Sequence, residues 1–269
     1  MNNTIAELRR LLDIIDEYGL YYFFKRISSK IIKPRIKKVK YIKQLFTDKS
    51  GIEIGGPSVI FRDKGFIPIY KVLKNLDGCN FSNSTIWEGN IKTETKYNYY
   101  KEGKGVQYIS EATDLSSIED SKYEFIISSN CLEHVANPLK AVKEWIRVIK
   151  EDGLILLILP NKKYCFDHNR NVTEFSHLLD DYKNNTKEDD LAHIDEILKF
   201  HDLKKDKTAG SFEEFKARSL DNLNNRALHQ HIFDLDLLKQ IYQYFELEIL
   251  ATHEGEEYIL LGRKILKRN

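Results

Sequence analysis

Between Gly51 and Leu159 the chain alternates short apolar runs with polar and helix-forming segments. This alternation limits the possible fold more than any other feature. Each apolar run has the length of one strand, and Leu154–Leu159 consists of aliphatic residues alone, as is typical of buried parallel strands. Pro138–Lys150 has the apolar spacing of a helix, with Pro138 in its first turn. The pattern predicts an α/β fold in which helices cover a doubly wound, mostly parallel sheet.

We expect a seven-stranded sheet. Its parallel strands are predicted at Ile52–Ile54, Val72–Leu76, Gly105–Ile109, Tyr123–Ser129 and Leu154–Leu159. Two further runs, Glu248–Thr252 and Tyr258–Arg263, are separated only by His253 to Glu257. This connection is too short for a helical crossover, so the two runs should form an antiparallel hairpin at the C-terminus.

Two segments fall outside the alternation. Residues 1–48 are predicted to form a helical N-terminal extension, and residues 49–269 the main domain, with a helical cap inserted at about 160–230. Between Lys25 and Lys43 the extension has nine basic residues and no acidic one. This segment could dock on phosphate, an anionic lipid face or a polyanion. A solvated helix face is the interpretation we favour.

Composition excludes several classes of protein. The formal net charge is +1, so no strong overall field points to nucleic acid or to a membrane surface. No apolar run is long enough to span a bilayer. The chain start lacks the basic and apolar regions of a secretion signal. Three widely spaced cysteines predict reduced thiols and a cytoplasmic protein. The oligomeric state stays open, a homo-oligomer included.

The stretch Gly51–Ser58 turns the chain sharply after the first predicted strand. In a doubly wound sheet, a nucleotide-like ligand binds outside the carboxyl end of this strand. Gly55 and Gly56 lack a Cβ, so the backbone there can approach a ligand closely. Glu53 would place a carboxylate beside that ligand. An ordinary Gly-Gly-Pro turn is the alternative.

Several runs resemble class I S-adenosylmethionine-dependent methyltransferases. Glu53-Ile54-Gly55-Gly56-Pro57 resembles the first motif of that family. Ser128 to Val135, followed by Asn137-Pro138-Leu139, closely resembles the "S-x-x-L-E-H-V-x-N-P" run of small-molecule methyltransferases. The resemblance covers roughly residues 50–160 and 229–265. Phe166-Asp167-His168-x-Arg170 and His229 to Asp234 are similar to a subgroup associated with bacterial surface-polysaccharide gene clusters.

The resemblance implies S-adenosylmethionine as cofactor and assigns residues to it. Asp77 would hold the ribose, and the segment from Glu111 to Leu115 would hold the adenine. The implied cofactor-binding residues are Glu53, Gly55, Gly56, Pro57, Asp77, Glu111, Ala112, Asp114, Ser129, Asn130 and His134. The first motif departs from the family's Gly-x-Gly, which leaves the path of this loop open. The chain has neither the Gly-x-Gly-x-x-Gly of dehydrogenases nor the Asn/Asp-Pro-Pro-Tyr/Phe motif of enzymes that methylate nucleic-acid bases.

The molecule that accepts the methyl group, here called the acceptor, should bind near the cap. Methylation of a hydroxyl requires removal of a proton, most simply by a histidine or carboxylate within reach. The candidate bases are His229, His231, His177 and His201. Of His229 and His231, one would act as the base while the other packs or caps. Arg170, Tyr164 and His168 are candidate substrate-binding residues. Arg170 would grip a phosphate or carboxylate, unless it pairs with Asp167 or Glu174.

Acids and histidines in the cap could supply a magnesium site: Asp180, Asp181, Glu188, Asp189, Asp190, His193, His201 and Asp202. They have no fixed ligand spacing, and we predict no metal. We expect O-methylation of an anionic small molecule, namely a sugar, nucleotide sugar or phosphorylated intermediate of surface polysaccharide biosynthesis. A small-metabolite N-methyltransferase and a non-catalytic methyltransferase-fold binding protein are the alternatives.

Overall fold

The computed structural model describes residues 39–85, 89–90, 96–100, 105–206 and 208–266. Most of the basic segment and of the predicted helical extension lies outside these residues. The chain divides into two compact units, Met1–Ile42 and Lys43–Asn269. The first described helix is α2 (Val39–Phe46). The sheet and the cap belong to the second unit.

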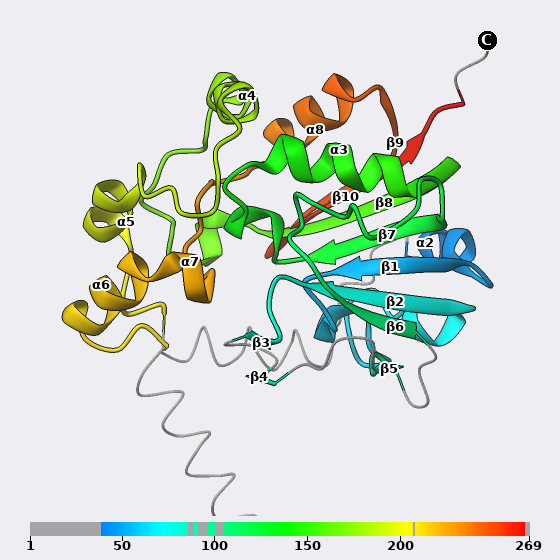
Figure 1. The fold of residues 1–269 in the computed structure, drawn as a ribbon, viewed down its shortest axis with the longest axis horizontal. Helices are drawn as coiled ribbons and strands as arrows, with labels where there is room; N and C mark the ends of the chain where they lie inside the picture. Colours follow the sequence, from blue (N-terminus) through cyan, green and yellow to red (C-terminus); the bar gives the residue numbers. More distant parts are fainter. Residues whose placement is uncertain (1–38, 86–88, 91–95, 101–104, 207, 267–269) are drawn as a thin grey trace, which may run out of the picture. The chain divides into compact units, whose positions relative to one another are not determined.

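An eight-stranded sheet forms the centre of this unit (Figure 1). From one edge to the other its strands are β5 (Lys96–Tyr97), β6 (Gly105–Ile109), β2 (Asn75–Asn80), β1 (Ser50–Ile54), β7 (Tyr123–Ser129), β8 (Ile149–Pro160), β10 (Glu257–Lys264) and β9 (Leu247–Glu254). β3 (Ser84–Thr85) and β4 (Gly89–Asn90) form a separate two-stranded ladder.

The order of the strands places a crevice at the end of β1. This strand pairs in parallel with β2 on one side and with β7 on the other, so the direction of winding reverses there. β6 and β8 extend the parallel part outward. Ligands of doubly wound sheets bind at such a reversal, outside the carboxyl ends of the strands.

The predicted α/β class and the C-terminal hairpin are confirmed. β10 pairs antiparallel with both β8 and β9. The sheet has one strand more than the seven expected, because the two residues of β5 pair antiparallel with β6. The second strand was predicted at Val72–Leu76, which is wrong. Tyr70–Val72 forms a 3-10 turn, and the strand runs from Asn75 to Asn80.

Helices α3 (Pro138–Val148) and α8 (Leu235–Tyr244) lie along one face of the sheet (Figure 1). Under them lies the main core, with fully buried Ile126, Trp145 and Leu238. Phe125 points to the opposite face, because neighbouring residues of a strand alternate sides. There it meets Phe46 edge to face, with ring centroids 4.9 Å apart.

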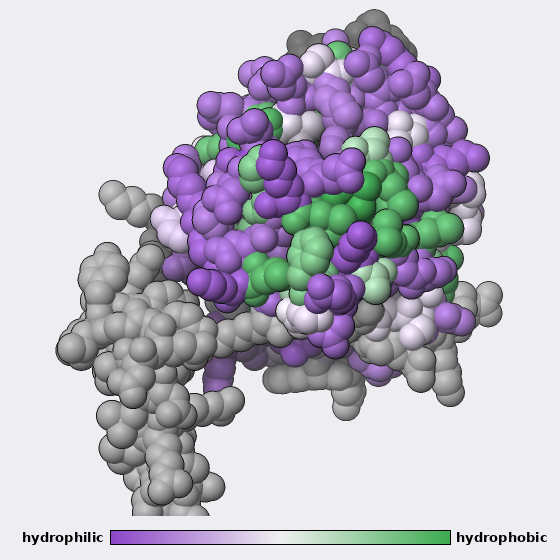
Figure 2. Space-filling view, turned by 90° about the vertical axis from the view of Figure 1, so that its left-hand side faces the viewer, coloured by the Kyte–Doolittle hydropathy of each residue, from purple (hydrophilic) through white to green (hydrophobic). Residues whose placement is uncertain are grey.

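The cap follows β8 and consists of α4 (Phe175–Asn184), α5 (Ile194–Phe200), α6 (Phe212–Leu220) and α7 (Asn222–Asn225). It lies at the left of Figure 1, beyond the carboxyl ends of β1 and β7. Figure 2 faces this end of the molecule and shows an apolar area among hydrophilic residues. Exposed apolar side chains of the cap include Phe200, Phe212, Leu220 and Leu223. Of the helices that are described, none is long and apolar enough to cross a membrane.

Candidate active site

A cavity of about 770 Å³ opens where the carboxyl ends of the parallel strands face the cap. The strand ends contribute residues of the predicted motifs, including Gly55, Pro57, Glu111, Ala112, Ser129, Asn130 and His134. The cap contributes Cys165, Phe166, Glu188, Asp206, Thr208, Arg218, Arg226, Ala227 and His229. The size is typical of a pocket for a cofactor or other small molecule.

The loop after β1 borders this cavity at Gly55. Its φ is +78°, a conformation that favours glycine. A Cβ on Gly55 would also lie 2.8 Å from the Cβ and Sγ atoms of Cys131, which lines the cavity as well. The absence of a side chain therefore keeps this part of the cavity wall open.

Glu53 supports this loop from behind. The carboxylate, expected beside the ligand, is fully buried and is not in the cavity wall. It accepts hydrogen bonds from the hydroxyls of Tyr70 (2.6 Å) and Tyr97 (2.8 Å) and from the backbone N–H of Ser58 (3.0 Å). A Cβ on Gly56 would lie 2.2 Å from the Glu53 carboxyl carbon. Gly56 thus makes room for Glu53, whose hydrogen bonds hold the loop.

Asp77 does not reach the cavity, because it lies in the middle of β2 and not at its end. Its carboxylate accepts hydrogen bonds from the Tyr123 hydroxyl (2.7 Å) and the Val106 N–H (2.9 Å). The residue at the end of β2 is Asn80, which lines the cavity. The Asn80 amide donates to the carbonyl oxygen of Gly56 at 3.0 Å and joins the first two strand ends.

Only part of the predicted adenine segment lines the cavity. Glu111 and Ala112 do, and Glu111 forms an ion pair of 2.6 Å with Arg226 of the cap. The indole N–H of Trp145 donates to the Ala112 carbonyl at 3.0 Å, which ties this segment to α3. Asp114 is exposed and accepts from the Ser116 N–H at 3.0 Å, so it stabilises a turn outside the cavity.

The run from Ser129 to His134 lies along the cavity at the end of β7. Asn130 has a φ of +50°, which turns the chain out of the strand. Glu133 is buried, and no described residue hydrogen-bonds to either of its carboxylate oxygens. Burial raises the pKa of Glu133 to about 7. A carboxyl group that titrates near neutral pH in a cavity wall marks a functional-site candidate.

His134 is part of the framework of this wall. Its Nδ1 lies 2.9 Å from the carbonyl oxygen of Leu228, so this nitrogen carries the proton and donates. Its ring meets that of His229 edge to face at 4.6 Å. Burial and the neighbouring His229 lower the pKa of His134 to about 3. It is therefore neutral and a poor proton acceptor.

Of the four candidate bases, His229 alone lines the cavity. Its Nδ1 lies 2.5 Å from Oδ2 of the buried Asp167. Burial lowers the pKa of His229, but the Asp167 carboxylate more than offsets this, so the pKa is raised overall. Burial alone would raise the pKa of Asp167. The attraction of His229 and Arg170 outweighs burial, so the pKa of Asp167 is lowered overall.

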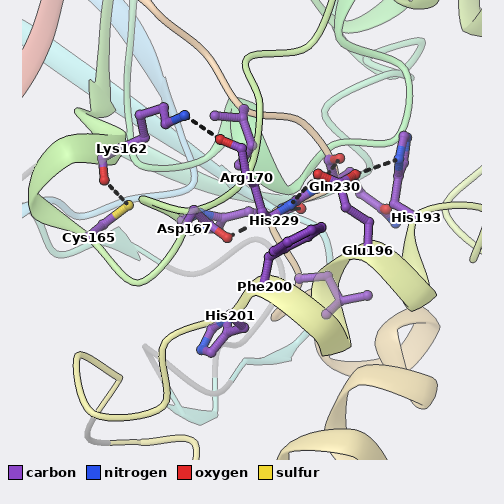
Figure 3. A network of polar contacts seen from close by, with 12 residues as sticks. Lys162, Cys165, Asp167, Arg170, His193, Glu196, Phe200, His201, His229 and Gln230 are labelled. Carbon is purple, nitrogen blue, oxygen red and sulfur yellow. Dashed lines mark hydrogen bonds and ion pairs between the residues drawn. The ribbon is translucent and has the colours of Figure 1, made fainter.

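Arg170 stabilises this pair from inside the protein (Figure 3). The guanidinium is buried and donates to Asp167 (3.3 Å), to Glu196 (3.3 Å) and to the carbonyl oxygens of His229 (2.7 Å) and Gln230 (3.3 Å). The proposed grip on a substrate phosphate is therefore wrong for Arg170. The alternative of an ion pair with Asp167 is confirmed.

The other predicted acceptor-site residues have partners elsewhere. His201 pairs with Asp206 at 3.2 Å and stacks on Phe166. His168 pairs with Asp202 at 2.9 Å. His177 and His231 lie together behind the cavity wall, near Asp181. Tyr164 is half exposed and does not line the cavity.

Sequence reasoning did not assign Asn80, Glu133 or Arg226 to the site, and it named Glu188 only as a possible metal ligand and Asp167 only as a possible partner of Arg170. Glu133 belongs to the Leu-Glu-His run, which was available as a signal. Asp167 stands in the predicted cap motif, but its link to His229 depends on the folding of the cap. Glu188 and Arg226 carry no local motif.

A family model described as a methyltransferase domain matches residues 69–157. A search of curated proteins found no match. Among solved structures, the chain resembles a SAM-dependent methyltransferase from Aquifex aeolicus, with 12% identity and a TM-score of 0.45, over 88% of this chain and 98% of that one. It also resembles one from Methanosarcina mazei, with 16% identity and a TM-score of 0.47, over 84% and 98% of the two chains.

Proposed function

We propose that this S-adenosylmethionine-dependent methyltransferase methylates a hydroxyl group of a small molecule, and that His229 removes the proton. The observation that carries this proposal is the Asp167–His229 pair in the cavity wall. Because Nδ1 is held by Asp167 at 2.5 Å, Nε2 is the nitrogen that can accept a proton. The Asp167 carboxylate stabilises the imidazolium that forms.

The cavity fits the cofactor in size and in the chemistry of its lining. Gly55 has no side chain to crowd the cavity wall beside Cys131. The Asn80 amide lies at the end of β2, in the same wall. Asn80 would hold the ribose, Glu111 and Ala112 the adenine, and residues 129–134 the methionyl end. When bound, S-adenosylmethionine supplies a methyl group that is activated by its sulfonium sulfur.

The protein's own contribution is orientation and proton removal. The acceptor hydroxyl must lie in line with the donor methyl group, and the cap walls that face the strand ends restrict where an acceptor can lie. His229 Nε2 would accept the hydroxyl proton, and bound S-adenosylmethionine would supply the methyl group to the oxygen and leave as S-adenosylhomocysteine. Arg170, through the carbonyl oxygens of His229 and Gln230, holds the segment that carries the base.

For the acceptor we propose a sugar, nucleotide sugar or phosphorylated intermediate of surface polysaccharide synthesis in the cytoplasm. Polar cap residues such as Thr208 in the wall suit a molecule rich in hydroxyls. Among the described residues, Arg218 and Arg226 are the arginines that line the wall, and a negative charge on the acceptor would depend on them. Both already pair with carboxylates, Asp206 and Glu111. The proposal that the acceptor carries hydroxyl groups is thus better supported than the proposal that it carries a negative charge.

The test measures release of S-adenosylhomocysteine across nucleotide sugars, sugar phosphates and small amines. We expect turnover with a hydroxyl acceptor, and a decrease in kcat of about 100-fold or more for His229→Ala. Titration should show unchanged binding of S-adenosylmethionine. His253→Ala, on β9 and outside the cavity, is the matched control. Undiminished turnover in His229→Ala would exclude the base, and turnover with amines alone would favour the N-methyltransferase alternative.

A further inference from the structure

Three histidines and one aspartate converge in the cap, outside the cavity wall. His177 and Asp181 lie one turn apart on α4, so their side chains share a face. His193 precedes α5, and His231 lies in the segment before α8. One ring nitrogen from each histidine lies within 4.8 Å of the others. We call these four residues the cap histidine cluster.

Without a metal ion, some polar atoms of this cluster lack hydrogen-bond partners. Oδ2 of Asp181 is buried and accepts no hydrogen bond from any described residue. Nε2 of His177 and Nε2 of His193 are 3.0 Å apart, so at most one of them can donate to the other. Buried polar atoms without partners are rare in native proteins and require an explanation such as an ion.

The distances agree with coordination of a metal. Zn²⁺ binds histidine nitrogen at about 2.0–2.1 Å in tetrahedral geometry, which separates neighbouring ligand atoms by roughly 3.3 Å. His177 Nε2 lies 3.0 Å from His193 Nε2 and 3.3 Å from Asp181 Oδ2. His231 Nε2 lies 3.6 Å from the same carboxylate oxygen. We propose that His177, Asp181, His193 and His231 bind one Zn²⁺ ion.

Metal binds the neutral form of the imidazole ring. The competing contact is His231 Nε2 with the Ala136 carbonyl oxygen at 3.2 Å, which the ion would replace. The half-exposed His177 leaves a route for the ion from solvent.

The site is structural because four protein ligands complete a tetrahedral shell. The ion would connect α4, the start of α5 and the segment before α8. His231 is two residues from His229, so the ion would hold the segment that carries the proposed base. The inference goes beyond the proposed reaction and departs from the expectation of no metal. Its ligands come from three separate segments, which is why local spacing did not reveal them.

A second group, Glu133, His134 and His229, also brings three ligand atoms within 4.8 Å of one another. Two of its nitrogens already have strong partners, since His229 Nδ1 contacts Asp167 and His134 Nδ1 contacts Leu228. We assign this group to the active site. The experiment must therefore show whether zinc binds at this group or at the cap histidine cluster.

The experiment uses the full-length protein after removal of metal with a chelator. Zn²⁺ is titrated in competition with a chromophoric chelator, bound zinc is counted by mass spectrometry, and Co²⁺ is added to record its visible spectrum. We expect one Zn²⁺ per chain, a tetrahedral Co²⁺ spectrum and a raised Tm. His193→Ala and Asp181→Asn should each weaken Zn²⁺ binding by more than the 10–100-fold that is usual for outer-shell changes.

His253→Ala and Glu133→Gln serve as controls and should bind Zn²⁺ like the wild type. Asp181→Asn changes no side-chain volume, which guards against simple misfolding as the cause of lost binding. Absence of stoichiometric zinc in the wild type would overturn the proposal. So would unchanged binding in both cluster variants, or loss of the zinc in Glu133→Gln instead.

Discussion

At the scale of single residues, the Asp167–His229 pair determines when the proposed base can act. The base must be neutral to accept a proton, so activity should rise with pH through the pKa of His229. Asp167 raises that pKa above the ordinary 6.5 of histidine. In a plot of kcat/KM against pH, the midpoint of the rise should therefore lie above pH 6.5.

Asp167→Asn removes the negative charge but keeps the size of the side chain. The pKa of His229 should fall, because burial then acts without the attraction of the carboxylate. We expect the rising limb of kcat/KM to move to lower pH, together with a loss of at least about tenfold in kcat at pH 8. The measurement is a pH–rate profile of the two proteins. A limb that stays in place would contradict the role of Asp167.

Some residues of the cavity wall could be predicted from sequence because they belong to local motifs. Gly55, Pro57, Glu111, Ala112 and the run after β7 line the cavity as the motif positions suggested. Asp77 was expected at the cavity because the strand that carries it was predicted a few positions too early. Arg170 was expected to bind substrate for another reason. Its guanidinium is buried and meets its partners only after the cap folds, and no local pattern reveals them.

At the scale of elements, α3 shows how one side chain can join two helices. Asn137 caps α3 by accepting from the Lys140 N–H at 3.1 Å. Its amide also donates to the Asp181 carbonyl oxygen on α4 at 2.8 Å. Asn137 is fully buried, so both contacts are shielded from water.

Asn137→Ala removes both contacts at once. We expect the free energy of unfolding to fall by about 2 kcal/mol, of which about half comes from the cap and half from the bond to α4. Asn137→Ser keeps a capping oxygen and should lose about half as much. Urea denaturation of the three proteins measures these differences. Equal losses in the two variants would show that the cap itself contributes nothing.

The elements differ in how well their ends could be predicted. Gly105–Ile109 and Tyr123–Ser129 have the predicted bounds. β8 begins earlier than predicted, at Ile149, because Ile149 pairs with Tyr123 of β7. Such pairing depends on a neighbour distant in sequence, which local apolar patterning does not reveal.

At the scale of the whole molecule, the cavity lies between the strand ends and the cap, so a ligand bound there contacts both. Binding to the folded state alone stabilises a protein by about 2.7 kcal/mol at a ligand concentration of 100 times Kd. For a chain of this size we expect S-adenosylhomocysteine to raise Tm by roughly 5–10 °C. Thermal unfolding with and without the ligand measures the shift.

NAD⁺ is the matched control for this shift, because it carries adenosine without the methionyl chain. We expect it to leave Tm nearly unchanged. A shift of equal size with both ligands would mean that the cavity recognises only the adenosine. No shift with S-adenosylhomocysteine would contradict the assignment of the cavity.

The mostly parallel sheet and its C-terminal hairpin followed from the sequence more readily than the cap did. Alternating strands and helices leave few ways to wind a parallel sheet, and the short C-terminal connection required a hairpin. The cap obeys no such rule. Its helices are short, and its arrangement depends on buried ion pairs such as Asp206 with Arg218 and Glu188 with Arg226. These join segments that no periodicity relates.

The segment that carries His229 and His231 places them in different surroundings, one in the cavity wall and one against Asp181 and Ala136. Substitution of a single residue there changes one contact. Deletion or insertion of one residue between Leu228 and Ile232 would instead move both histidines out of these surroundings at once. Natural variants of this protein should therefore tolerate changes of residue type in this segment far better than changes of length.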